Sequence, residues 1–345
     1  MEKIYLISGA AGFVGNNVIK LLAAEKKKIR ALVNSPGKEK TALNGINAEF
    51  LYGDVRKLSD LEQLFKKGEN CEYIFIHAAS VVDIESNRFN QKLYDINVNG
   101  TKNVLEVCKA HKVKRLVYVS SVHAIEEPAN KALTKETENF DPAKVHGVYA
   151  KTKAEASACV LKAVKEGLNA VMVHPSGIIG PNDYSNTHMT QMIANFASRR
   201  IPGSPNGAYD FVDVRDVAKA IITACDKGKA GSCWILGGSF ITISEMFKIL
   251  GELLGRKKAL PKFPMWAAKL GAPFMQIFAK LTKSRPLYTS YALYTLRSNG
   301  NFCHDKAAAE LGFKPRPIRE TLADTLEFLM KNEDSHRGTE VTERR

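Results

Sequence analysis

The chain has 345 residues, of which 45% are hydrophobic and 25% charged, and this balance excludes disordered, collagen-like and small disulfide-stapled proteins. Fifty Lys and Arg against 36 Asp and Glu give a net charge of +14, which favours anionic partners of several kinds. The six cysteines form no C-x-x-C pair and the first apolar run stops at Ser8, so we expect reduced thiols, no metal site and a cytoplasmic protein.

The first half of the chain alternates short apolar runs with amphipathic runs, which is typical of a parallel sheet covered by crossover helices. We therefore predict an α/β fold with one doubly wound parallel sheet, a Rossmann domain, from residues 1–175 and a return segment at about 211–236. The predicted strands are 4–8, 29–33, 48–52, 73–77, 115–120 and 169–173, and the predicted helices are 12–26, 58–67, 91–111 and 149–166.

After Pro175 this rhythm breaks into segments rich in Gly, Pro and Asn. A smaller substrate-binding lobe is predicted from 176–210 and 237–330. Helical patterns recur within it near 244–254 and 319–331. The tail 331–345 is charged and has no apolar period, so we expect it to be mobile.

A glycine-rich turn, Gly9-Ala-Ala-Gly12-Phe13-Val14-Gly15, follows the first predicted strand and opens the first predicted helix. Glycine lets the backbone turn tightly and approach a pyrophosphate, and the helix N-terminus offers free N–H groups and a positive dipole. The strand before the turn and the helix after it favour a dinucleotide site over a plain connection.

The side chains at the ends of the second and third predicted strands indicate which dinucleotide binds. A carboxylate at the end of the second strand would bond a ribose 2′-hydroxyl, whereas a cation would accept a 2′-phosphate. The strand ends in Asn34 with Lys38 beyond it, which favours NADP as cofactor and leaves NAD open. Asp54, followed by Val55 after the third strand, is interpreted either as an acceptor for the adenine amino group or as an Asx turn.

Tyr149 and Lys153 are four residues apart and share one face of a predicted helix. A nearby ammonium lowers the pKa of a phenol and makes it a better proton donor or acceptor. Ser120 and Ser121 end the fifth predicted strand. Because strand ends and the following helix starts share one edge of a parallel sheet, Ser121, Tyr149 and the glycine-rich turn should converge there.

These motifs, in this order, resemble the extended short-chain dehydrogenase/reductase family, within the NAD-dependent epimerase/dehydratase superfamily. The resemblance spans nearly the whole chain and is strongest to the dihydroflavonol-4-reductase-like and 3β-hydroxysteroid-dehydrogenase-like branch, which includes bacterial hopanoid-associated sugar epimerases. The segments that carry it are 9–15, 53–54, 77–79, 97–101, 118–121, 149–153, 174–175, 180–181, 211–218, 235–238 and 310–317.

The resemblance implies a role for each candidate residue. Tyr149 would exchange a proton with a substrate carbonyl or alcohol, Lys153 would bond the nicotinamide ribose and hold the Tyr149 pKa down, and Ser121 would bond the substrate oxygen. Departures from the family pattern are Asn34 and His174, each where many relatives carry arginine. Further residues implied to line the cofactor are Ala78, Ala79, Ser80, Pro175, Gly177 and Ile178.

The loops that set specificity in this family correspond to 80–83, 122–125 and 184–189. They mix apolar with hydrogen-bonding side chains and contain no acidic trap, which indicates a neutral, partly apolar carbonyl compound as substrate. The Asp-Glu pair that follows the serine in sugar-nucleotide 4,6-dehydratases is missing. His123 and His146 lie near the expected cavity and are interpreted as its hydrogen-bonded walls.

We predict an NAD(P)-dependent carbonyl reductase or alcohol dehydrogenase that acts on a small molecule. The alternatives are an NAD-dependent sugar-nucleotide 4-epimerase and a cofactor-sensing binding protein without chemistry, and the intact Ser121, Tyr149 and Lys153 argue against the latter. The resemblance also implies a homodimer in which helices 91–111 and 149–166 pair with those of a second copy.

A basic stretch lies late in the chain, with ten Lys and Arg and one Asp from Arg256 to Lys306. Within 260–281, large apolar side chains recur at helical spacing, which indicates either packing on the core or contact with an anionic membrane surface. No nucleic-acid-binding module is recognisable, so we expect no nucleic-acid partner.

Overall fold

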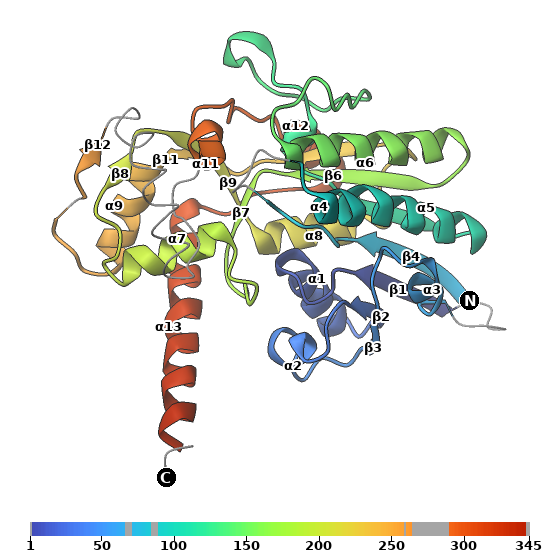
Figure 1. The fold of residues 1–345 in the computed structure, drawn as a ribbon, viewed down its shortest axis with the longest axis horizontal. Helices are drawn as coiled ribbons and strands as arrows, with labels where there is room; N and C mark the ends of the chain where they lie inside the picture. Colours follow the sequence, from blue (N-terminus) through green and yellow to red (C-terminus); the bar gives the residue numbers. More distant parts are fainter. Residues whose placement is uncertain (1, 66–70, 84–88, 259, 264–289, 343–345) are drawn as a thin grey trace.

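The computed structural model describes residues 2–65, 71–83, 89–258, 260–263 and 290–342 (Figure 1). Its centre is a parallel seven-stranded sheet in the order β10-β6-β5-β4-β1-β2-β3, which confirms the predicted doubly wound fold. The chain reverses its winding direction between β1 and β4, the place where such sheets open a binding crevice. The strands are β1 Glu2–Ser8, β2 Lys28–Val33, β3 Glu49–Tyr52, β4 Cys71–His77, β5 Arg115–Val119, β6 Ala170–Pro175 and β10 Cys233–Leu236.

Helices bury both faces of this sheet, which is why its strands read as continuous apolar runs rather than alternating ones. One face packs against α3, α5 and α6, and the other against α1, α8 and α12. Every residue of β6 and β10 is buried. These helices are α1 Phe13–Ala24, α3 Leu58–Glu62, α5 Gly100–Ala110, α6 Val148–Lys165, α8 Val214–Ala224 and α12 Asp305–Leu311, and short α2 Lys38–Ala42 follows β2.

A second lobe has its own core and lies beside the carboxyl ends of the central strands (Figure 1). It contains a three-stranded sheet in the order β11-β9-β7 and a two-stranded sheet of β12 and β8. Its strands are β7 Gly177–Ile179, β8 Ser204–Pro205, β9 Ala208–Asp213, β11 Ser239–Thr242 and β12 Lys262–Phe263, and its helices are α7 His188–Ala197, α9 Ile243–Leu253, α11 Ser290–Thr295 and α13 Ile318–Thr342.

Charged pairs join the last helix to the rest of the molecule. Arg316 Nη2 lies 2.8 Å from Asp216 Oδ1 on α8, and Arg215 Nη1 lies 2.6 Å from Asp324 Oδ2 on α13. Beyond these anchors α13 projects away from the body (Figure 1). The helix continues to Thr342, past its predicted end at residue 331.

Two further elements differ from the predictions. The predicted helix 91–111 is divided into α4 Gln91–Tyr94, a π-helical turn η1 Asp95–Asn99, and α5. The π turn re-aims side chains at this point, as such insertions commonly do at functional sites. Segment 305–311, assigned to the substrate lobe, forms α12 and packs on β10 and α8 of the nucleotide-binding layer, because Ala307 and Leu311 are buried there.

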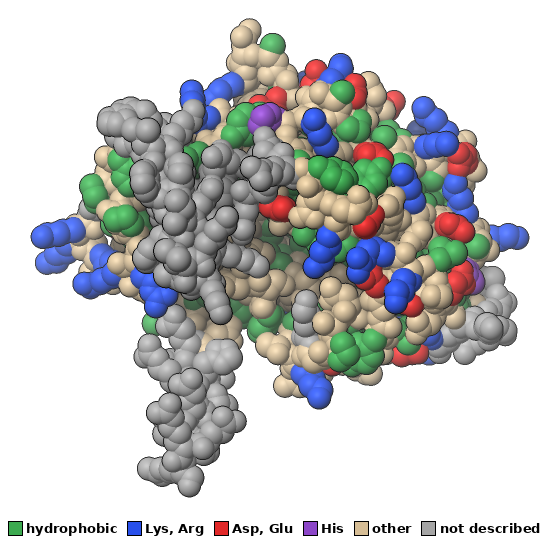
Figure 2. Space-filling model, in the orientation of Figure 1, with side chains coloured by type: hydrophobic (Ala, Val, Ile, Leu, Met, Phe, Trp, Pro, Cys, Tyr) green, Lys and Arg blue, Asp and Glu red, His purple; other side chains and the backbone are tan. Residues whose placement is uncertain are grey.

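The positive charge does not gather into one patch on the face shown in Figure 2, where Lys and Arg side chains are interspersed with Asp and Glu. Many of these charges are paired, as are Lys109 with Glu166 and Lys114 with Glu72. Within the described ranges, no helix is long and apolar enough to cross a bilayer. The predicted membrane-facing stretch 260–281 lies outside the described residues from 264 onward, so that prediction stays untested.

Candidate active site

The glycine-rich turn joins β1 to α1 at the carboxyl edge of the sheet. Gly9 has a φ of +75°, and a Cβ there would lie 2.5 Å from the backbone nitrogen of Ala79. A Cβ on Gly15 would lie 2.1 Å from the carbonyl oxygen of Gly9. Gly12 precedes α1, and no side chain caps the first N–H groups of the helix. This close-packed turn at an uncapped helix N-terminus fits the pyrophosphate of a dinucleotide.

The loop after β4 lies against this turn and is held by Asn97, a buried residue of the π turn. Asn97 Oδ1 accepts hydrogen bonds from the Ser80 hydroxyl at 3.0 Å and from the Val81 backbone N–H at 2.8 Å. Asn97 Nδ2 donates to Thr152 Oγ1 on α6 at 3.1 Å. Asn97 therefore ties the predicted cofactor-lining loop to the predicted catalytic helix. Sequence reasoning assigned Asn97 no site role, because the motif alone does not show which way its amide points.

The residues that follow β2 and β3 lie where the adenosine of a dinucleotide is expected. Asn34 is exposed directly after β2, and Lys38 is the first residue of α2. Asp54 forms the Asx turn that was one of its two interpretations, since Oδ1 accepts the Arg56 backbone N–H at 2.9 Å. The Arg56 guanidinium also bonds both Asp54 oxygens and thereby lowers the pKa of this carboxyl. Contact of Asp54 and neighbouring Val55 with adenine stays a prediction.

The connection from β6 to β7 forms another wall at the same edge. Pro175 ends β6, and Gly177 and Ile178 open β7. A Cβ on Gly177 would lie 2.9 Å from the carbonyl oxygen of Asp210, so this residue permits the close approach of β9. His174 is buried, stacks on Phe140 and bonds the Ser121 carbonyl oxygen through Nδ1 at 3.1 Å. These contacts fit the interpretation of His174 as a structural residue at the end of a strand.

The fold brings Ser121, Tyr149 and Lys153 together, as their order in the sequence predicted. Tyr149 lies in the first turn of α6 and Lys153 one turn later. The Ser121 hydroxyl, just beyond β5, lies near enough to the Tyr149 phenol to favour its ionised form. Lys153 Nζ donates to the Val119 carbonyl oxygen at 2.8 Å. Ser120 instead bonds Ser157 at 2.8 Å and belongs to the packing of α6 on the sheet.

The sequence predicted that Lys153 lowers the pKa of Tyr149, but in the fold burial raises that pKa. Burial raises the pKa of Tyr149 to about 12, and the nearby Ser121 hydroxyl opposes this only in part. Burial also lowers the pKa of Lys153 to about 7. The interior penalises both the phenolate and the ammonium, and the Lys153 amine is turned toward Val119 and lies 5.0 Å from the centroid of the Tyr118 ring. The phenol is therefore protonated at neutral pH.

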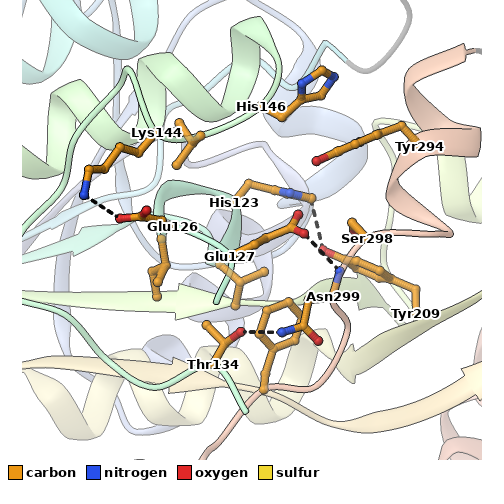
Figure 3. Close-up of a pocket in the computed structure, with 14 residues that line it drawn as sticks. His123, Glu126, Glu127, Thr134, Lys144, His146, Tyr209, Tyr294, Ser298 and Asn299 are labelled. Carbon is orange, nitrogen blue, oxygen red and sulfur yellow. Dashed lines mark hydrogen bonds and ion pairs between the residues drawn. The ribbon is translucent and has the colours of Figure 1, made fainter. Parts of the chain in front are cut away.

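A cavity of about 150 Å³ opens between the nucleotide-binding domain and the second lobe (Figure 3). Its wall combines aromatic, aliphatic, amide and charged side chains. Of the three predicted specificity loops, only 122–125 contributes to this wall. The lining residues are Val122, His123, Ile125, Glu126, Glu127, Thr134, Lys144, Val145, His146, Tyr209, Tyr294, Ser298, Asn299 and Phe302.

Two carboxylates just outside the predicted specificity loops also line this wall. Glu126 pairs with Lys144 at 3.0 Å. Glu127 Oε2 accepts the Asn299 backbone N–H at 3.2 Å (Figure 3). These residues follow the predicted loop directly, and the fold turns them toward the cavity. Among the described lining residues, two carboxylates thus stand against one lysine.

The parallel sheet, the glycine-rich turn and the buried serine, tyrosine and lysine define a nucleotide-dependent enzyme of the Rossmann class. The family model described as "NAD dependent epimerase/dehydratase family" matches residues 5–237. The chain therefore belongs to this family of NAD-binding proteins, and the resemblance to extended short-chain dehydrogenases/reductases is confirmed.

The chain is similar to bacterial and plant proteins over most of their length. The sterol demethylase protein B of Methylococcus capsulatus is 29% identical, with 93% of this chain and 96% of that protein covered. A putative dihydroflavonol 4-reductase of Synechocystis is 27% identical, with 96% of both covered. The 3beta-hydroxysteroid-dehydrogenase/decarboxylase isoform 1 of Arabidopsis thaliana is 27% identical, with 99% and 83% covered. Among solved structures, gox2253 superposes with a TM-score of 0.78 at 28% identity, with 95% of this chain and 98% of that chain covered.

Proposed function

We propose that the protein is an NAD(P)-dependent oxidoreductase that reduces the ketone or aldehyde of a partly apolar small molecule, or oxidises the corresponding alcohol. The observation that carries this proposal is the neighbouring Ser121 and Tyr149, with Lys153 one turn away, beside a cavity with aromatic and aliphatic walls. Relatives whose names contain sterol, hydroxysteroid and dihydroflavonol support an apolar carbonyl compound.

The chain's own groups supply the proton transfer and the positioning. A bound nicotinamide dinucleotide supplies or accepts the hydride. Tyr149 holds its proton at Oη at neutral pH because burial raises its pKa to about 12, and this makes it a donor to an oxygen that gains negative charge. The Ser121 hydroxyl holds that oxygen beside the phenol. Lys153 would bond the nicotinamide ribose with the protons of its amine that do not go to Val119.

The residues that would hold the rest of the dinucleotide are those of the glycine-rich turn and the loop fixed by Asn97. Asn34 is exposed and supplies no carboxylate that would repel a 2′-phosphate, and the sequence offers a lysine at position 38. We therefore propose NADP as the preferred cofactor, with NAD as the other choice.

The charges of the described lining residues weigh against the alternative of a sugar-nucleotide 4-epimerase. A nucleoside diphosphate carries two or more negative charges and is best bound by unpaired cations. Here Glu126 neutralises Lys144, and Glu127 adds a further negative charge. A neutral substrate with an apolar body avoids this repulsion.

The test is consumption of NADPH, then NADH, with a panel of aromatic, steroid, aliphatic and flavanonol ketones. We expect turnover of at least one ketone, and Tyr149→Phe should lower it by roughly 100-fold or more, since the variant loses only the acid. Tyr94→Phe, which removes a phenol bonded to Glu155 away from the cavity, is the matched control. Wild-type turnover in Tyr149→Phe, or tight cofactor binding without consumption, would contradict the proposal and direct the search to sugar nucleotides.

We also propose that α5 and α6 pair with those of a second copy in a homodimer. Partly exposed apolar side chains that include Ile96, Ala158 and Leu161 lie along this side of the molecule. Sedimentation equilibrium should give the mass of two chains. A mass of 38.1 kDa at micromolar concentration would reject the dimer.

A further inference from the structure

A histidine in the cavity wall lies against both members of the catalytic pair. His123 belongs to the short 3-10 turn Val122–Ala124, and its backbone N–H donates to Ser121 Oγ at 3.2 Å. Its ring meets the ring of Tyr149 edge to face, with centroids 6.1 Å apart and an interplanar angle of 73°. His123 thus contacts the backbone turn that carries Ser121 and the ring of Tyr149 at once.

The other side of the same imidazole is fixed by the second lobe. His123 Nε2 lies 3.1 Å from the Tyr209 hydroxyl, and the two rings stack with centroids 5.9 Å apart (Figure 3). Tyr209, on β9, is itself held edge-on by Phe211 at 5.9 Å and Phe302 at 6.1 Å. An aromatic chain therefore runs from the core of the second lobe, along the cavity wall, to Tyr149.

The imidazole in this position is neutral. Burial lowers the pKa of His123 to about 4, so at neutral pH the ring carries one N–H and one lone pair and is no reservoir of protons for the reaction. Its contribution is orientation. A misplacement of reacting groups by about 1 Å can lower a rate by roughly 100-fold, so a group that fixes the phenol and the hydroxyl together affects the chemical step.

We propose that His123 is a positioning residue for the proton transfer: its ring, held by Tyr209, fixes Tyr149 against the substrate oxygen in the cavity, while its backbone N–H holds the Ser121 hydroxyl beside it. This inference rests on the proposed role of Tyr149. It makes the second lobe part of the catalytic arrangement, because the hydroxyl that orients the imidazole comes from β9.

Three variants test the inference in the full-length protein. Tyr209→Phe removes one hydroxyl and leaves a ring between His123, Phe211 and Phe302. His123→Phe keeps a ring beside Tyr149 and removes both nitrogens, whereas His123→Gln supplies an amide in place of the imidazole. We expect Tyr209→Phe and His123→Phe to lower kcat about tenfold with the cofactor Kd within about twofold, and His123→Gln to recover most of the loss.

The double variant His123→Phe/Tyr209→Phe shows whether the two residues lower kcat through one shared interaction or through two independent effects. If one hydrogen bond between these residues is responsible, the double variant is no slower than the worse single variant. Losses that multiply, or a wild-type kcat in Tyr209→Phe, would overturn the inference. The pH profile gives a further readout: above about pH 5 its shape should be the same in wild type and His123→Gln, whereas loss of an acidic limb in the variant would show that His123 transfers a proton.

Titration of Tyr149 followed by NMR of ring-¹³C-labelled tyrosine needs no substrate. Loosening His123 should admit water to the phenol, so in Tyr209→Phe the Tyr149 pKa should fall by more than about half a pH unit toward its ordinary value. An unchanged titration would overturn the inference even if no ketone had been found. Turnover that survives Tyr149→Phe would instead overturn the proposed function, so the two failures are distinguishable.

Discussion

Lys153 forms no ion pair with any residue that the structure describes, and its replacement by methionine should make the protein more stable while ending catalysis. The ammonium is buried on α6, and among the described hydrogen bonds its Nζ donates to the Val119 carbonyl oxygen. Burial lowers the pKa of Lys153 from 10.5 to about 7. The unfolded chain binds this proton more tightly than the folded protein does, so protonation favours unfolding.

The magnitude follows from that difference in pKa. At neutral pH the folded state loses roughly 4 kcal/mol relative to a neutral side chain of the same size, at about 1.4 kcal/mol per pH unit. Methionine is unbranched and similar in length, and it leaves the Val119 carbonyl without its hydrogen bond, at a cost of roughly 1–2 kcal/mol. Lys153→Met should therefore raise the free energy of unfolding at pH 7 by about 2–3 kcal/mol.

The sign of the effect should depend on pH. The penalty on Lys153 is greatest below pH 7 and disappears as the pH rises toward 10.5, where the unfolded chain also loses the proton. Urea denaturation should thus find Lys153→Met more stable than wild type at pH 7, and equally or less stable at about pH 10. A variant that is less stable at pH 7, or a difference that does not change with pH, would refute the reasoning.

Three further predictions concern the cofactor site and the buried histidines. Gly15→Ala should abolish dinucleotide binding in a fluorescence titration, because its Cβ would lie 2.1 Å from the Gly9 carbonyl oxygen; binding within about threefold of wild type would contradict the tight turn. Asn34→Asp should shift the ratio of kcat/KM for NADPH and NADH toward NADH by about tenfold, and an unchanged ratio would place the selecting residue elsewhere. His77 and His174 have pKa values lowered by burial to about 3 and about 4, below the value of about 6.5 in the unfolded chain, so unfolding gains protons in acid. The free energy of unfolding should fall steeply from pH 6.5 to pH 4, and a flat profile in urea titrations over this range would contradict the neutral, buried state of these rings.

The placement of the candidate catalytic group could be predicted from local sequence. The apolar runs before Gly9 and Ser121 form parallel strands, and the chain order of such strands puts their carboxyl ends on one edge. A spacing of four residues then puts Tyr149 and Lys153 on one helical face. These features depend on backbone conformation and periodicity, which a short stretch of sequence specifies.

The π turn could not be read from the sequence. Its residues fit an uninterrupted helix, and the extra residue per turn appears only where Gly100 packs tightly against Val55 and Asn97 bonds the loop after β4. The function of Asn97 is therefore a consequence of tertiary contact. The same is true of α12, whose small side chains gave no indication of which layer they would join.

The sequence by itself determined the parallel sheet, the dinucleotide turn and the Tyr-x-x-x-Lys helix, because each depends on contacts between residues close in the chain or on the order of strands. Tertiary structure decided the cavity, since Tyr209 and Asn299 reach His123 and Glu127 from segments far along the chain. It also decided the protonation of the site. A neighbouring lysine predicts a lowered tyrosine pKa, but burial of both groups is a property of the whole fold, and here it outweighs their proximity.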